Sequence, residues 1–377
     1  MTRGPFRSST SKSLAWRALQ GVVIAAQLGA AALGRTRRVD VIIYKVDRLG
    51  DWLLAEPSIR RLVAATEARG GTAVVWASRE SRPLRAWRPL PCAVESLAFE
   101  PRGWRARLSR TLNLIRLLAV YRADSLYCLR HAPDPIRDFM LRAVAAKNRY
   151  ALTWRMFPGP LGAVPHEVQR HHWILGAANQ APVDPRSLLP HLAPAAGNVT
   201  PRLTIAPFSS APIKDVPDRF WADVVSEFSS LPRTWELWVG PDQCARAEAL
   251  AVRILALAPA GTRVTVRSGS LAELAAAISA ASLVLSVDTL AAHLAAAFDV
   301  PLVALVGGGQ YGDFAPWSRS ERQQWLSHPL PCFHCGWHCS RAQNDCLQLI
   351  APRTVVAAMH ALEARKSAPD RLAPVSS

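Results

Sequence analysis

The sequence predicts an α/β fold of two doubly wound units, each a parallel sheet covered by helices, that face one another across a cleft. From Val39 onward, short β-branched runs alternate with helical patterns, which is typical of parallel sheets wrapped by helices. The 377 residues, half of them hydrophobic, are enough for two buried cores. A proline-rich stretch, residues 182–201, interrupts the alternation and indicates a linker.

The first unit is predicted over residues 39–181 and the second over 202–350, followed by a C-terminal helix and disordered tail over 351–377. Strands are assigned to short apolar runs and helices to stretches with apolar residues three or four apart. In the first unit the elements are the strand Val39–Tyr44, helix Trp52–Ala68, strand Thr72–Ala77, helix Arg105–Val120, strand Ser125–Leu129 and helix Pro135–Ala146. In the second they are the strand Leu203–Pro207, helix Asp218–Phe228, strand Trp235–Val239, helix Gln243–Leu257, strand Arg263–Val266, helix Leu271–Ala280, strand Leu283–Val287, helix Leu290–Phe298 and strand Leu302–Val306.

The net charge of +17 points to an anionic partner: nucleic acid, anionic lipid or a phosphorylated glycan. Residues 1–38 form a tail with seven basic residues and no acidic one. Its uncharged, alanine-rich stretch, residues 18–34, favours a helix on a membrane surface, with Arg17, Gln20 and Gln27 on one face. The alternatives are a spanning helix, a signal peptide or a disordered tail. Removing residues 1–35 is expected to weaken membrane association and leave both units folded.

Seven cysteines are too few and too clustered for an exported disulfide scaffold, so the reducing cytoplasm is the expected compartment. Four of them lie within fifteen residues, 332–346, and could form a tetrahedral zinc site or hold an iron–sulfur group. Their spacing differs from paired CxxC knuckles, and a packed lobe without metal is the alternative. The four are Cys332, Cys335, Cys339 and Cys346.

The loop after the first strand, residues 45–51, carries charged side chains. A dinucleotide site would show three spaced glycines here, whereas only Gly50 is present. Asp51 would begin the next helix, where the helix dipole favours the ionised carboxylate, and such a group in a cleft can accept a proton from a hydroxyl. The alternative is that Asp51 only caps the helix.

Three loops of the second unit suit a phosphate-bearing ligand. Ser209 and Lys214 follow its first strand, where a lysine can meet phosphate oxygens as a point charge. Asp288 and Thr289 precede a helix whose free amides could receive a diphosphate, with His293 one turn later. Gly307, Gly308 and Gly309 would let the backbone approach a ligand closely. A solvated lysine, an ordinary capped helix and a flexible connection are the corresponding alternatives.

Four segments together resemble glycosyltransferase family 9, the ADP-heptose:lipopolysaccharide heptosyltransferases. They are YKVDRLGDWLLAEPSIRRL, IAPFSSAPIKDVP, LVLSVDTLAAHLAAAFDVPLVALVGGG and CFHCGWHCSRAQNDCLQLIAPRTVVAAM, within residues 39–359. The resemblance implies a GT-B architecture and an inverting, metal-independent transfer. It gives Asp51 the role of general base, and donor-phosphate binding to Lys214 and to the segment of Asp288, Thr289 and His293.

The chain departs from the family pattern in its donor half. Leu290 stands where a glycine is usual, three glycines replace the common FGPT-like loop, and only Asp242 represents the acidic residue expected to hold the nucleotide ribose.

In the acceptor half, four arginines offer cations for phosphate or carboxylate groups. They are Arg60, Arg61, Arg130 and Arg137.

The expected function is transfer of a sugar, heptose from ADP-heptose, onto a lipopolysaccharide-core or related cell-envelope glycan. No cofactor is expected to be required for catalysis. A zinc ion at the cysteine cluster would be structural. The partners are the nucleotide-sugar, an anionic glycolipid acceptor and the inner face of the inner membrane, with no nucleic acid. The alternatives are a degenerate family member that binds nucleotide-sugar without turnover, and a basic cysteine-cluster protein that binds nucleic acid. An oxidoreductase is disfavoured because the glycine fingerprint is missing.

Overall fold

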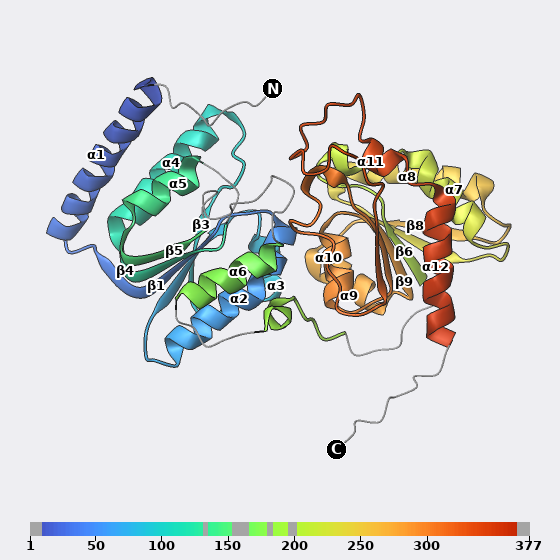
Figure 1. Ribbon diagram of the computed structural model, residues 1–377, viewed down its shortest axis with the longest axis horizontal. Helices are drawn as coiled ribbons and strands as arrows, with labels where there is room; N and C mark the ends of the chain where they lie inside the picture. Colours follow the sequence, from blue (N-terminus) through green and yellow to red (C-terminus); the bar gives the residue numbers. More distant parts are fainter. Residues whose placement is uncertain (1–9, 131–134, 153–165, 179–183, 195–201, 368–377) are drawn as a thin grey trace, which may run out of the picture. The chain divides into compact units, whose positions relative to one another are not determined.

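The computed structural model describes residues 10–130, 135–152, 166–178, 184–194 and 202–367 (Figure 1). Residues 1–9, both ends of the predicted linker (182–183 and 195–201) and residues 368–377 of the C-terminal tail lie outside the described residues. The chain divides into two compact units: one comprises Met1–Pro158 and Glu167–Leu188, the other Gly159–His166 and Leu189–Ser377. Each unit contains one sheet in which all paired neighbours are parallel, so the predicted α/β fold is confirmed.

The sheet of the first unit has the strand order β3-β2-β1-β4-β5. Its strands are β1 (Arg37–Lys45), β2 (Ala73–Ser78), β3 (Ala93–Leu97), β4 (Tyr121–Cys128) and β5 (Ala145–Ala151). Its helices are α1 (Thr10–Ala32), α2 (Leu49–Glu67), α3 (Arg82–Trp87), α4 (Gly103–Val120), α5 (Pro135–Ala143), α6 (Glu167–Ala177) and the 3-10 turn η2 (Pro185–Leu188). Figure 1 shows α4 and α5 on one face of the sheet and α2, α3 and α6 on the other. The strand order reverses direction between β1 and β4, which is where open sheets form a ligand crevice.

The predicted helix Pro135–Ala146 is wrong at its end. Helix α5 stops at Ala143, and Ala145–Ala151 is the edge strand β5, paired with β4 from Arg122 to Cys128. The segment AAKNRYA is rich in residues that are uncommon in strands, so its composition did not reveal the strand. Tertiary pairing with β4 decides its conformation.

Helix α1 packs on the first unit instead of standing apart from it (Figure 1). Val23 is buried in the core beside α4, and the Gln27 amide donates to the carbonyl oxygens of Leu118, at 3.1 Å, and Ala143, at 3.2 Å. The face that carries Gln27, expected to be the water-facing side of a membrane helix, is therefore turned towards the protein. Removing residues 1–35 would uncover this part of the core, so the expectation that both units stay folded does not fit the structure. None of the described helices is long and apolar enough to cross a membrane.

The sheet of the second unit has the order β11-β10-β9-β6-β7-β8. Its strands are β6 (Arg202–Ala206), β7 (Thr234–Trp238), β8 (Arg263–Arg267), β9 (Leu283–Val287), β10 (Leu302–Leu305) and β11 (Gln323–Leu326). The helices are α7 (Asp218–Phe228), α8 (Cys244–Leu257), α9 (Leu271–Ala280), α10 (Leu290–Ala297), α11 (Asp345–Gln348) and α12 (Pro352–Ser367), with the 3-10 turns η3 (Pro212–Lys214), η4 (Pro241–Gln243) and η5 (Gly308–Gln310). Helices α7, α8 and α12 cover one face and α9 and α10 the other (Figure 1). The strand order of this sheet reverses direction between β6 and β9.

Candidate functional site

In both units, predicted site residues follow the two strands that flank the reversal of strand order. In the first unit, Asp51 follows β1 and Arg130 follows β4. In the second, Lys214 follows β6 and Asp288 follows β9. Because all strands of a parallel sheet end at one edge, each unit gathers its pair at the position where open α/β sheets bind ligands.

A buried charge network fixes the loop after β1. The ammonium of Lys45, the last residue of β1, lies 2.6 Å from the Glu167 carboxylate and 3.2 Å from that of Asp47. All three side chains are buried, and Glu167 opens α6, more than a hundred residues away in the chain. The Arg130 guanidinium contacts the other oxygen of Asp47 at 2.8 Å. The network therefore joins β1, β4 and α6 around the loop.

Asp51 lies in the first turn of α2, where Arg48 occupies the N-cap position and no side-chain cap is formed. Burial raises the pKa of the Asp51 carboxyl well above its usual value, and the charge of Asp47 and a hydrogen bond with it act in the same direction. Burial alone would also raise the pKa of Asp47, but Lys45 and Arg130 reverse this and hold it below its usual value. Two neighbouring carboxyls are thus driven apart in pKa, an arrangement typical of acid–base sites.

The four predicted acceptor arginines occupy different surroundings. Arg130 is buried, contacts Asp47 and stacks over Phe99, with its guanidinium carbon 4.7 Å from the ring centre. Arg137 is also buried, and its side chain donates to the Arg130 carbonyl at 2.6 Å. Arg60 pairs with Glu56 at 2.7 Å, and the neighbouring Arg61 is half-buried. These two lie about 14 and 15 Å along α2 from Asp51, at about 1.5 Å per residue. Only Arg130 and Arg137 therefore share a local network with the loop after β1.

In the second unit, three predicted donor residues meet in one cluster. The Lys214 ammonium lies 2.7 Å from Oδ2 of Asp288, and Nε2 of His293 lies 3.6 Å from Oδ1 of the same carboxylate. Burial would raise the pKa of Asp288, but the charge of Lys214 and the nearby His293 imidazole hold it well below its usual value. The cluster therefore contains a carboxylate that stays ionised and a lysine held in place by it.

The tautomer of the neutral His293 ring follows from its neighbour. Nε1 of Trp317 lies 2.9 Å from Nδ1 of His293, and an indole nitrogen can only donate. Nδ1 must therefore accept, which places the proton of the neutral ring on Nε2, facing Asp288. Sequence reasoning had no signal for Trp317, which is 24 residues away in the chain.

The other predicted donor residues lie in loops that follow strands of the same sheet. Thr289 is the N-cap of α10 and accepts a hydrogen bond from the Ala291 amide at 3.3 Å. Ser209 is buried and accepts from the Ala211 amide, so its hydroxyl shapes the loop of Lys214. Asp242 lies exposed on η4, after β7. The amides of the first turn of α10 are the groups best suited to an anion here.

The glycine loop after β10 packs against the segment of residues 332–346, which we call the cysteine lobe. A Cβ atom at Gly307 or Gly309 would come within 2.4 Å of the Trp337 ring, and one at Gly308 within 2.2 Å of Phe333. The close approach that these glycines permit is thus made by the aromatic rings of the lobe. That the backbone of this loop also approaches the donor remains a prediction.

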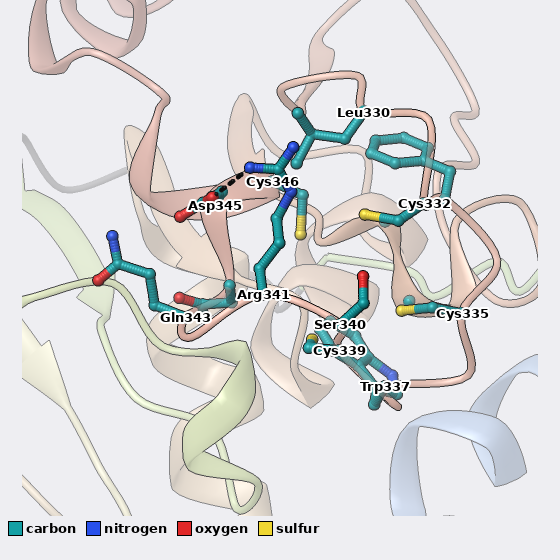
Figure 2. Close-up of a pocket in the computed structure, with 14 residues that line it drawn as sticks. Leu330, Cys332, Cys335, Trp337, Cys339, Ser340, Arg341, Gln343, Asp345 and Cys346 are labelled. Atoms are coloured by element: carbon teal, nitrogen blue, oxygen red, sulfur yellow. Dashed lines mark hydrogen bonds and ion pairs between the residues drawn. The ribbon is translucent and has the colours of Figure 1, made fainter.

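All four cysteines of the lobe line one pocket, together with Arg341 and Asn344 (Figure 2). Burial raises the pKa of the Cys346 thiol, while a backbone hydrogen bond from Gly308 acts in the opposite direction. Burial, followed by the charge of Cys335, also raises the pKa of Cys339. No set of three or more His, Cys, Asp or Glu side chains in the described ranges is already arranged as metal ligands.

Several residues of these sites were not singled out from the sequence. Lys45 and Asp47 lie in the predicted loop of residues 45–51. Charged side chains directly after a buried apolar strand are a signal that could have identified them. Glu167 and Asn344 carry no local signal, because their importance comes from partners distant in the chain.

The family model for glycosyltransferase family 9 (heptosyltransferase) matches residues 176–341. A search of curated protein sequences finds no match. Among solved structures, a glycosyl transferase of family 9 from Veillonella parvula is 15% identical, with a TM-score of 0.66 over 87% of this chain and 98% of its own. The Escherichia coli heptosyltransferase WaaC with ADP is 17% identical, with a TM-score of 0.59 over 86% of this chain and 100% of its own.

A third similar structure is the iron-containing dodecameric glycosyltransferase TibC of Escherichia coli. It is 17% identical, with a TM-score of 0.55 over 88% of this chain and 78% of its own. The structural likenesses establish the fold, and the family match covers the second sheet with its Lys214 and Asp288 loops. The resemblance predicted from the sequence is confirmed by these matches.

Proposed function

We propose that this chain, a glycosyltransferase that resembles family 9, transfers heptose from ADP-heptose onto a lipopolysaccharide-core or related cell-envelope glycan. The observation that carries the proposal is the cluster of Lys214, Asp288 and His293 at the switch point of the second sheet. Solved structures with this fold include heptosyltransferases with ADP and with ADP-2-deoxy-2-fluoro heptose, which makes ADP-heptose the first donor to test.

In the proposed single displacement, Asp51 removes the proton from the acceptor hydroxyl as that oxygen attacks the anomeric carbon. The bond from the anomeric carbon to the diphosphate oxygen breaks, and the nucleoside diphosphate leaves with the electron pair. Lys214 and the first amides of α10 stabilise the negative charge that develops on the leaving phosphate. Asp288 holds the Lys214 ammonium in place through their 2.7 Å ion pair. Arg130 lies beside the acceptor-side base and offers a cation for an anionic acceptor.

The donor site is tested by thermal stabilisation of the purified chain with ADP-, GDP- and UDP-sugars. We expect one nucleotide-sugar to raise the melting temperature, and Lys214→Ala to weaken its binding about 10- to 100-fold, as expected for loss of one hydrogen bond to a charged group. Lys147→Ala, which removes an exposed lysine of the first unit, is the matched control. No stabilisation of the wild-type chain by any of the nucleotide-sugars would contradict the proposal.

We also propose that the four cysteines of the lobe hold one structural metal ion, zinc before iron. Four thiols in one pocket form a ligand set that suits tetrahedral Zn²⁺, and a structural ion would leave the transfer itself metal-independent. The test is the metal content of the purified chain, measured by elemental mass spectrometry. We expect about one ion per chain, lost in Cys346→Ser and kept in Cys244→Ser, whose cysteine lies outside the lobe. Equal metal content in both variants would refute the site.

For the cell, we propose a cytoplasmic protein that binds the inner face of the inner membrane through the outer side of α1 and α4. Exposed apolar side chains on these helices include Leu28, 68% exposed, and Trp104, 69% exposed; the others are Val22, Ile24, Leu108 and Leu112. Helix α4 carries four basic residues and no acidic one. Apolar side chains among basic ones suit an anionic lipid surface.

Flotation with vesicles that contain anionic phospholipid tests this surface. We expect the double variant Trp104→Ser/Leu108→Ser to lose most vesicle binding, because these side chains are exposed and their loss leaves the core intact. The matched control is Val252→Ser/Leu255→Ser, which removes exposed apolar side chains from α8 of the second unit. Equal flotation of the two double variants would show that the α1 and α4 surface is not responsible.

A further inference from the structure

Asn344 connects the cysteine lobe to the loop that carries Lys214. It lies between Cys339 and Cys346, and its side chain is buried. Nδ2 of Asn344 donates to the carbonyl oxygens of Ile213, at 2.7 Å, and Asp215, at 2.9 Å. These two residues flank Lys214, so a single side-chain amide is hydrogen-bonded to the loop on both sides of the lysine.

The amide of Asn344 is itself held in one orientation. Its Oδ1 accepts a hydrogen bond from Gln348 at 2.7 Å, which leaves the NH₂ group directed at the two carbonyls. Both hydrogens are then used, and the amide cannot flip without losing all three bonds. The position of the 213–215 backbone is therefore tied to that of α11.

The cysteine lobe also places an aromatic ring, that of Trp337, beside Lys214. The Lys214 ammonium lies 5.4 Å from the centre of the Trp337 ring, within the range of a cation–π contact. Trp337 is in turn fixed by a 3.1 Å hydrogen bond to Gln310 and by its packing on the glycine loop. Asp288 contacts the same ammonium from the loop between β9 and α10. The ammonium is thus placed jointly by Asp288, by Trp337 and by the backbone that Asn344 holds.

We infer that Asn344 is a positioning residue for the donor, tying the Lys214 loop to the cysteine lobe so that the ammonium is preorganised for a nucleoside diphosphate. The inference rests on the proposed function, because it takes Lys214 as the group that meets the diphosphate. Asn344 itself need not touch the donor. Its effect is expected to pass entirely through Lys214.

Calorimetric titration of the full chain with ADP tests this directly. Asn344→Ala removes two buried hydrogen bonds to the loop, and we expect ADP to bind roughly tenfold more weakly. Gln343→Ala, which truncates the exposed amide next to it, should bind ADP as the wild type does. With donor sugar and acceptor, the KM for the donor should rise in Asn344→Ala while the KM for the acceptor stays unchanged.

A double-variant cycle separates positioning from general damage. If Asn344 acts through Lys214, then adding Asn344→Ala to Lys214→Ala should weaken ADP binding less than twofold further. A full tenfold loss in that background, or wild-type affinity in Asn344→Ala alone, would overturn the inference. If the wild type binds none of ADP, GDP or UDP, the proposed function fails instead.

Asn344→Asp provides a second test of the inference if Asn344→Ala does not fold. Aspartate retains an acceptor for Gln348 and is a favoured N-cap for α11, but it cannot donate to the Ile213 and Asp215 carbonyls. We expect ADP binding at least as weak as in Asn344→Ala, with an unchanged circular dichroism spectrum. Wild-type ADP affinity in Asn344→Asp would show that the two donated hydrogen bonds do not position Lys214.

Discussion

Replacing Asp51 by asparagine is expected to lower kcat by about 10²- to 10⁴-fold, the usual contribution of a general base. Asparagine has nearly the same size but cannot accept the proton of the acceptor hydroxyl. ADP affinity should stay at the wild-type value, because Lys214 and Asp288 belong to the other unit. The measurement is steady-state transfer to acceptor beside calorimetric ADP binding. Asp124→Asn, which changes an exposed aspartate of β4, is the control.

The pH dependence offers a second test of the same residue. Burial and the charge of Asp47 raise the Asp51 pKa, and only the ionised carboxylate can act as base. Transfer should therefore be retained above this raised pKa and lost as the pH falls through it, at a pH higher than for an ordinary aspartate. Asp47→Asn removes a charge that raises the Asp51 pKa, so the acid limb should move to lower pH. An acid limb that stays in place in Asp47→Asn would argue against Asp51 as the titrating base.

The sequence predicted the fold well where strands are buried. Runs such as residues 283–287 and 302–305 are buried throughout and apolar except for Ser286, because helices cover both faces of a parallel sheet. The edge strand β5 was missed, since its exposed side chains carry no apolar pattern. The environment of α1 was also missed, because a helix that hides a glutamine and shows leucine to solvent reverses the usual pattern.

For the site, the loops after the strands were predictable and the supports behind them were not. Four predicted residues lie in the loop or the first helical turn that follows a strand, where parallel topology gathers ligand-binding groups. They are Asp51, Lys214, Asp288 and His293. Glu167 meets Lys45 across 122 positions of the chain, and Asn344 meets Ile213 across 131. Such long-range partners are fixed only by the tertiary fold, so no local pattern announces them.

Removal of Glu167 is expected to destabilise the first unit strongly. Its carboxylate is fully buried against Lys45, also fully buried, and lies 3.2 Å from His171. Glu167→Ala leaves these groups without their main partner, which typically costs about 3–5 kcal/mol of unfolding free energy. Urea denaturation should show this loss, whereas Glu100→Ala, which breaks an exposed pair with Arg48, should cost less than about 1 kcal/mol. Equal denaturation midpoints for Glu167→Ala and Glu100→Ala would contradict this expectation.

Replacing both partners separates stability from function. Apolar residues of similar volume can substitute for a buried ion pair at little cost, so Lys45→Met/Glu167→Leu should regain much of the stability lost in Glu167→Ala. The positive charge of Lys45 lowers the Asp51 pKa more than Glu167 raises it, so losing both should raise that pKa further. The acid limb of transfer should then move to higher pH in a chain that is well folded. Such a result would mean that the buried pair serves to keep Asp51 ionised, and an unchanged acid limb would assign it a structural role alone.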